Sequence, residues 1–170
     1  CAPDKQALEK VVVVVPLHRE TLSAAEHYSL ARSLQALSAR EIVFVGPESL
    51  NIDCYTRDFP GIPYIPLDDN HFASIKGYNR LMMNPAFYDA FSGFEYMLIL
   101  QPDAIVLQDA LDEWCARGYD YVGAPWPDGY ALSVGVGRFA GANARNVRLH
   151  VGNGGLSLRR IASCTRLLGE

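Results

Sequence analysis

A short apolar run, MLIL at residues 97–100, stops abruptly at the triplet Gln101-Pro102-Asp103. A continuous apolar run is typical of a strand covered on both faces, as in the parallel sheets of α/β proteins. Pro102 has no backbone N–H to donate, so strand pairing is expected to end there. Asp103 would then lie at the carboxyl end of a central strand, where open α/β sheets bind ligands. An unpaired carboxylate is costly to bury, so a metal ion, a ribose or a sugar hydroxyl is expected beside it.

The rest of the chain alternates apolar runs with helical patterns. A helix capped by Thr21 or Ser23 follows the first strand, and Pro85 suits the first position of a later helix. Residues 47–61 are polar and are expected to be irregular, and residues 125–148 are expected to be a Gly-rich loop. This alternation predicts an α/β fold with a mostly parallel sheet. The other expected strands are residues 10–16, 41–46, 62–67 (near an edge, because of its prolines), 119–124 and 151–159; the other expected helices are 74–83, 85–91 and 161–168.

Composition limits the class of protein. The 170 residues, 49% hydrophobic and 20% charged, suit one folded domain over residues 1–170. A net charge of −4 without a Lys/Arg block argues against a nucleic-acid partner. No apolar run approaches the roughly 18 residues of a transmembrane segment. The cysteines are widely spaced and form no Cys-x-x-Cys pair, which predicts reduced thiols and a cytoplasmic protein; they are Cys1, Cys54, Cys115 and Cys164.

Three ordered segments carry a family resemblance: LQPDA at 100–104, YDYVGAPW at 119–126 and VGNGGLSLR at 151–159. Together they resemble a bacterial group of glycosyltransferase domains and, more distantly, the family that contains glycogenin and lipopolysaccharide sugar transferases. Residues 101–103 occupy the place of the Asp-x-Asp triplet of these GT-A-type enzymes. The resemblance implies a GT-A-like, Rossmann-type three-layer sandwich with a mostly parallel central sheet. The first half of the chain matches more loosely.

The same resemblance implies an activity. It implies a transferase that moves a sugar from a nucleotide-diphosphate sugar to the hydroxyl of a saccharide or lipid-linked saccharide, in bacterial surface polysaccharide synthesis. The expected location is the cytoplasm, with peripheral association at the inner face of the membrane. The chain lacks an initiator Met and stops soon after its last expected helix begins, so we expect a domain truncated at its C-terminus.

Several residues are expected to bind the donor. Asp103 is expected to coordinate Mg²⁺ or Mn²⁺, since hard cations prefer oxygen ligands and borrow others from substrate phosphates. Gln101 stands where the family usually has Asp, and its uncharged amide predicts weaker metal binding. In the loop after the first strand, His18 and Arg19 are expected to hold the nucleotide and its phosphates. A solvated polar turn is the alternative reading of that loop.

The segment KGYNR on the helix before the central strand offers further donor contacts. Tyr78 would stack on a base, Lys76 or Arg80 would pair with phosphate, and Asn79 belongs to the same cluster. A helix with one solvated face is the alternative interpretation, and the pattern slightly favours it.

The segment Gly152-Asn153-Gly154-Gly155 is expected to lie beside the sugar and the acceptor. Its glycines permit unusual backbone angles and close ligand approach, and Asn153 can both donate to and accept from sugar hydroxyls. Trp126 would supply a stacking surface for the sugar, although a lone Trp more often belongs to a core. The alternative is a tight hairpin turn without chemistry.

The sequence nominates no strong catalytic base. In the resembled group an acidic motif is expected beyond the end of this chain, which leaves Asp120 and Asp128 as weak candidates. GVGRFA at residues 135–140 matches the dinucleotide fingerprint, but no convincing strand precedes it and no helix follows it. A loop over the sugar site is expected there instead. His27, His71 and His150 lack metal-ligand spacing.

Two other functions stay open. A nucleotidyltransferase would share the Rossmann-like half and use carboxylates to hold Mg²⁺, but it would usually show a glycine-rich basic loop where this chain has PLHRE at 16–20. A non-catalytic module that binds nucleotide sugars would fit both Gln101 and the short C-terminus.

Overall fold

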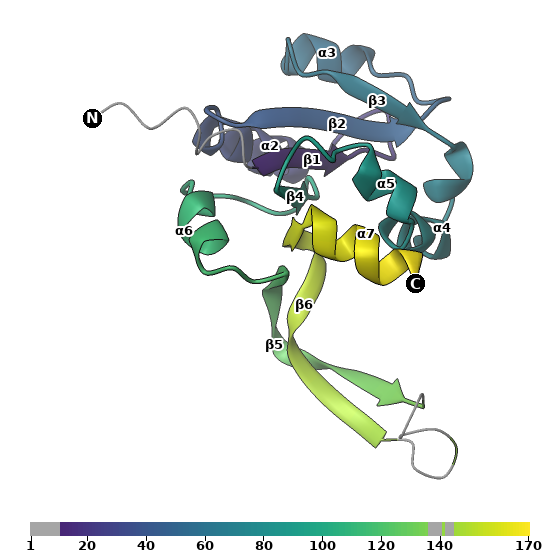
Figure 1. The fold of residues 1–170 in the computed structure, drawn as a ribbon. Coiled ribbons are helices and arrows are strands. Elements are labelled where there is room, and N and C mark those ends of the chain that lie inside the picture. Colours follow the sequence, from purple (N-terminus) through teal and green to yellow (C-terminus); the bar gives the residue numbers. More distant parts are fainter. Residues whose placement is uncertain (1–10, 136–140, 142–144) are drawn as a thin grey trace.

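The computed structural model describes residues 11–135, 141 and 145–170. These residues form a six-stranded sheet in the order β3-β2-β1-β4-β6-β5 (Figure 1). The first four strands in this order pair in parallel, whereas β6 runs antiparallel to both β4 and β5. The sheet is therefore mostly parallel, and β3 lies at an edge as expected. The strands are β1 (Val11–Pro16), β2 (Glu41–Pro47), β3 (Tyr64–Leu67), β4 (Tyr96–Leu100), β5 (Tyr121–Val134) and β6 (Arg145–Arg160).

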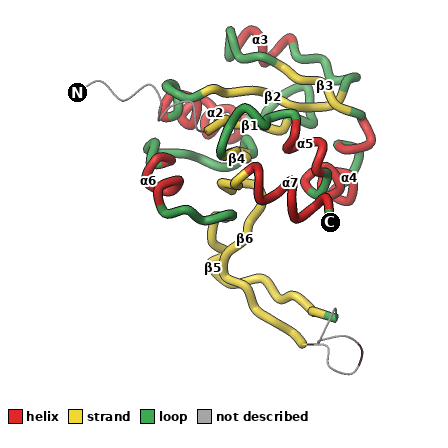
Figure 2. Tube along the Cα trace, in the orientation of Figure 1, coloured by secondary structure: helices red, strands yellow, loops and turns green. Residues whose placement is uncertain are grey.

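Helices cover both faces of the sheet. On one face α2 (Ala24–Ala36), α3 (Asp53–Asp58) and α6 (Leu111–Ala116) pack against the odd-numbered valines of β1. On the other face α4 (Ile75–Met82), α5 (Pro85–Asp89) and α7 (Ile161–Gly169) lie together (Figure 2). Their buried side chains pack against Val12 and Val14. Alternate residues of a strand point to opposite faces, so one five-valine run supplies both cores. The expected α/β class and three-layer sandwich are confirmed.

Local signals set several helix starts. Ser23 caps α2 and forms a capping box with Glu26, and Pro85 occupies the first turn of α5 as predicted. The expectation that residues 47–61 are irregular was wrong, because they include α3. Tertiary contacts explain the difference. Tyr55 of α3 is 3% exposed, and its hydroxyl donates a 2.6 Å hydrogen bond to the carbonyl of Arg19. One buried anchor thus holds a polar segment in helical form.

Strands β5 and β6 are much longer than predicted and form an arm that leads away from the sheet (Figure 1). The expected Gly-rich loop at residues 125–148 was therefore wrong for most of its length. Alternating apolar residues pair across the arm, with Tyr130 opposite Leu149 and Leu132 opposite Val147. Apart from Gly135, the dinucleotide-like segment at residues 135–140 lies outside the described residues.

Candidate functional site

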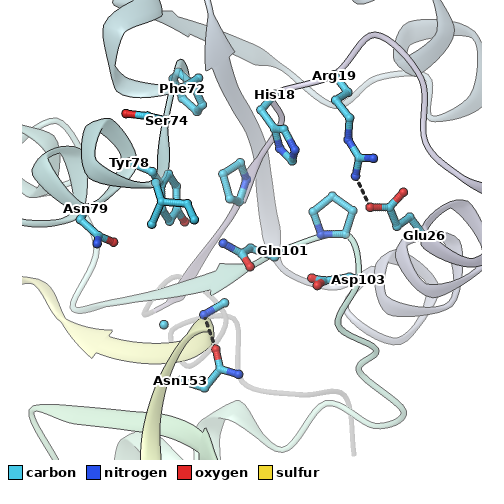
Figure 3. A pocket seen from close by; sticks show the side chains of 15 residues that line it. His18, Arg19, Glu26, Phe72, Ser74, Tyr78, Asn79, Gln101, Asp103 and Asn153 are labelled. Atoms are coloured by element: carbon cyan, nitrogen blue, oxygen red, sulfur yellow. Dashed lines mark hydrogen bonds and ion pairs between the residues drawn. The ribbon is translucent and has the colours of Figure 1, made fainter. Parts of the chain in front are cut away.

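A cavity of about 440 Å³ opens at the carboxyl ends of β1 and β4 (Figure 3). Side chains from α4 line one side of it, and Arg19, Glu26 and Asp103 line the opposite side. Ligands of open α/β sheets bind at this end of the strands. The lining residues are Pro16, His18, Arg19, Glu26, Phe72, Ser74, Ile75, Tyr78, Asn79, Gln101, Pro102, Asp103, Asn153, Gly154 and Gly155.

A bulge in β6 forms the third wall. The register between β5 and β6 passes from Gly123–Ser157 to Ala124–Asn153, which leaves the intervening residues of β6 without partners on β5. These residues turn toward β4 instead, where the backbone N–H of Gln101 donates a 2.7 Å hydrogen bond to the backbone carbonyl of Gly155. The glycine segment is thus a bulge inside a strand rather than a hairpin turn. This bulge brings residues 153–155 to the same cavity as Asp103.

Gly155 has a steric reason to be glycine. A Cβ atom at this position would lie 2.5 Å from the Oε1 atom of Gln101. The Gly155 amide also donates a 2.9 Å hydrogen bond to Oδ1 of Asn153. The Gln101 side chain therefore packs directly on the bulge, and its position depends on the missing side chain at residue 155.

The loop after β1 places two basic side chains in the cavity. Arg19 forms an ion pair with Glu26, whose carboxylate also accepts hydrogen bonds from the amide and hydroxyl of Ser23 at 2.9 and 2.7 Å. The bonds from Ser23, with a smaller contribution from Arg19, hold the pKa of Glu26 below its ordinary value. Partial burial and then the charge of Arg19 lower the pKa of His18, against the opposing effects of Glu26 and Asp103. His18 is therefore mostly neutral at pH 7.

Helix α4 presents only part of the KGYNR cluster to the cavity. Ile75, Tyr78 and Asn79 line it, at the i, i+3, i+4 spacing that shares one helical face. Lys76 and Arg80 are exposed and do not line the cavity.

Asp103 is exposed to the cavity and can offer one metal ligand. Across the described residues, no group of three or more His, Cys, Asp or Glu side chains is arranged to hold a metal ion. The other carboxylate of the cavity, Glu26, is paired with Arg19. A divalent cation at Asp103 would therefore need most of its ligands from substrate phosphates and water, a mode that Mg²⁺ commonly adopts.

Comparison with known proteins identifies the family. Residues 61–170 match the family described as "Protein of unknown function (DUF5672)". The chain belongs to this family. No curated protein matches the sequence. Among solved structures, the crystal structure of 4-diphosphocytidyl-2C-methyl-D-erythritol synthase is similar, with a TM-score of 0.51 and 12% identity, covering 95% of this chain and 79% of that chain. At this identity the likeness shows the fold alone.

Other predicted site residues of this DUF5672 member lie outside the cavity lining. Trp126 packs over Gly152 and against the ring of Tyr130, with 5.3 Å between the two ring centroids. Asp120 accepts a 2.6 Å hydrogen bond from the hydroxyl of Ser163. Asp128 lies on the arm. Neither nominated base is thus placed at the cavity, and Trp126 supports the base of the arm.

Sequence reasoning missed some residues of the cavity. Glu26 is the most informative of them, and its signal was present as the capping box Ser23-Ala-Ala-Glu26. Phe72, Ser74 and Ile75 carried no comparable signal, because their position depends on how α4 packs on the sheet.

Among the described residues, no helix is both long and apolar enough to cross a lipid bilayer.

Proposed function

We propose that this chain binds a nucleotide-diphosphate sugar in the cavity and transfers the sugar to a hydroxyl acceptor. One observation carries the proposal: Asp103, Gln101 and the bulge at residues 153–155 meet at one cavity although Asp103 and the bulge are about fifty residues apart in sequence. The cytoplasmic location, the saccharide acceptor and the role in surface polysaccharide synthesis belong to the same proposal.

Each wall of the cavity has a role in this proposal. Asp103 binds Mg²⁺ or Mn²⁺ together with the donor diphosphate, and the bound cation would neutralise charge on the departing phosphate. Arg19 and His18 bind phosphate oxygens from the loop after β1. Asn153 donates to and accepts from sugar hydroxyls, and its Oδ1 atom is already oriented by the Gly155 amide.

A binding module without transferase activity is the second candidate. It is favoured by the position of the two nominated bases, since neither Asp120 nor Asp128 lines the cavity. An inverting transferase needs a base next to the acceptor hydroxyl. A nucleotidyltransferase is less well supported, because the loop from Leu17 to Leu22 contains no glycine.

The test is a thermal-shift panel of nucleotide-diphosphate sugars with and without Mn²⁺. A bound ligand raises the melting temperature by mass action. We expect at least one sugar nucleotide to do so, and we expect Asp103→Ala to abolish the shift. Asp128→Ala is the matched control, since it removes an exposed carboxylate on the arm and should leave the shift intact. Release of free sugar from the bound donor would then distinguish the enzyme from the module. A panel in which no sugar nucleotide shifts the wild-type protein would refute the proposal.

A further inference from the structure

Arg159 of β6 is a buried cation without a buried counter-charge. It is 7% exposed. Its Nε atom donates to the hydroxyl of Ser157 at 3.0 Å, and its Nη1 atom donates to the hydroxyl of Tyr88 at 2.6 Å and lies 3.6 Å from the sulfur of Met82. It forms no ion pair with any carboxylate of the described chain. Burying a charge is costly unless the charge is paired, so an anion is the expected missing partner.

The guanidinium lies directly behind the bulge that forms the third wall of the cavity. A Cβ atom at Gly154 would lie 3.4 Å from Nη2 of Arg159. The hydroxyl of Ser157 ties the two together, because it accepts from Arg159 and donates a 3.1 Å hydrogen bond to the carbonyl of Gly154. The ring of Tyr121 lies 5.5 Å from the guanidinium carbon and restricts it further. Gly154 itself lines the cavity, whereas Arg159 does not, so Arg159 lies one residue behind the lining.

A second polar group beside this wall is unsatisfied. The hydroxyl oxygen of Tyr78 is buried and has no hydrogen-bond partner within the described part of the protein. Burial raises the pKa of Tyr78, and the positive charge of Arg159 offsets part of that rise, as does the Gln101 side chain, which approaches the hydroxyl without the distance and angle of a hydrogen bond. The hydroxyl thus keeps its proton at neutral pH. An unpartnered buried donor is rare in native proteins and commonly marks a place that a ligand or water occupies.

We propose that Arg159 and Tyr78 form a phosphate subsite at Gly154, in which Nη2 and the phenolic hydroxyl donate to oxygens of one phosphate group. Arginine binds phosphate strongly because its planar donors match the spacing of phosphate oxygens. The assignment of that phosphate to a sugar-nucleotide donor rests on the proposed function. The affinity for phosphate does not, because it follows from the guanidinium and the hydroxyl alone.

The chain supplies a matched control at the next residue. Arg160 points to the other side of β6, where its guanidinium lies over the ring of Tyr96 and within 3.7 and 3.8 Å of the carboxylates of Glu95 and Asp120. Both arginines belong to one strand and carry the same charge. Only Arg159 lies behind the cavity wall, so the two variants separate a local effect from a change in net charge.

The experiment is calorimetric titration of inorganic pyrophosphate, at fixed ionic strength and with EDTA present, into wild-type protein and four variants. We expect Arg159→Gln to weaken binding roughly tenfold, or about 1.4 kcal/mol. Tyr78→Phe should weaken binding by a smaller factor, and Arg160→Gln should leave it unchanged. Gly154→Ala keeps Arg159 but places a methyl group over Nη2 at a contact distance that the backbone tolerates, and should also weaken binding. This variant retains the test if Arg159→Gln fails to fold.

Two outcomes would overturn the subsite: wild-type protein that binds no pyrophosphate, or variants at Arg159 and Gly154 that bind it as well as wild type. The proposed function fails separately. Pyrophosphate binding that requires Arg159, combined with no response to any sugar nucleotide, would leave the subsite standing and remove the transferase proposal. A sugar nucleotide that binds equally well to wild type and Arg159→Gln would support the binding step of the proposed function and would show that the donor phosphate does not occupy this subsite.

Discussion

Two buried arginines on opposite faces of the sheet differ in how their charge is balanced. Arg40, 8% exposed, donates to Asp109 at 2.6 and 3.0 Å and to Asp112 at 2.9 Å. Arg159 is equally buried but, within the part of the chain that the structure describes, it donates only to two hydroxyls and a sulfur atom. The first charge is neutralised by the chain itself, next to the start of α6. The second is held by neutral dipoles behind a cavity wall, so its charge remains available to a ligand.

The pKa of Arg40 shows the same contrast in electrostatic terms. Burial by itself lowers the pKa of the guanidinium, but the hydrogen bonds that it donates to Asp112 and Asp109 outweigh burial and raise the pKa above its ordinary value. The folded protein therefore stabilises this charge strongly. Since one carboxylate, that of Asp109, also accepts from the backbone amide of Leu111 at 3.0 Å, the ion pair and the start of α6 depend on each other.

The largest effect is expected from breaking the paired arginine. Asp109→Ala removes the carboxylate that accepts two of the hydrogen bonds from the Arg40 guanidinium, and it also removes the acceptor for the Leu111 amide. We expect the free energy of unfolding to fall by about 3 kcal/mol, since removing one partner of a buried ion pair leaves the other charge less well compensated. Urea denaturation measures this, with Asp128→Ala as the control. A loss below about 1 kcal/mol would show that the remaining contacts of Arg40 are sufficient.

A smaller effect is expected from removing the unpaired arginine. Arg159→Met strands no carboxylate, and both hydroxyls keep a backbone acceptor: Tyr88 donates to the Met82 carbonyl and Ser157 to the Gly154 carbonyl. We expect the free energy of unfolding to change by about 1 kcal/mol or less, because apolar replacement of a buried charge is often neutral. The same urea series provides the measurement. A loss as large as that of Asp109→Ala would mean that Arg159 is mainly structural.

The smallest effect is expected in the pH dependence of ligand affinity, because His18 takes up a proton when an anionic ligand binds. The pKa of His18 is lowered in the free protein, so the imidazole is mostly neutral at pH 7. A nearby diphosphate favours the charged form and raises that pKa, so affinity should increase as pH falls from 8 to 6, by roughly threefold. Titrations should use a sugar nucleotide, which lacks the phosphate monoester proton that titrates near pH 6. His18→Gln should remove the pH dependence; an unchanged slope would place the proton elsewhere.

Much of the fold followed from local patterns. The valine run of β1, the apolar run of β4, the prolines of β3 and the cap at Ser23 each act through neighbouring residues, and each appears in the structure near its predicted place. Helix α3 could not be predicted in this way. It depends on Tyr55 reaching a core built by residues distant in sequence.

The residues of the candidate site also fall into two groups, those predictable from local patterns and those that depend on tertiary packing. Polar residues at the carboxyl ends of β1 and β4 must share one edge of a parallel sheet, so His18, Arg19, Gln101 and Asp103 were predictable as neighbours. The separation of Tyr78 and Asn79 from Lys76 and Arg80 depends on how α4 is rotated on the sheet. The exclusion of Trp126, Asp120 and Asp128 depends on where β5 and β6 diverge.

The amino-acid sequence by itself determined the succession of most strands and helices along the chain, the three-layer class and the carboxylate at the end of β4. These features depend on apolar periodicity and on backbone constraints. Only the tertiary structure decided that the glycine segment is a bulge facing Gln101, and that Arg159 is buried without a carboxylate partner among the described residues. Register shifts and ion pairing join residues far apart in the chain. Burial and charge compensation are properties of the packed whole, and no local pattern of residues encodes them.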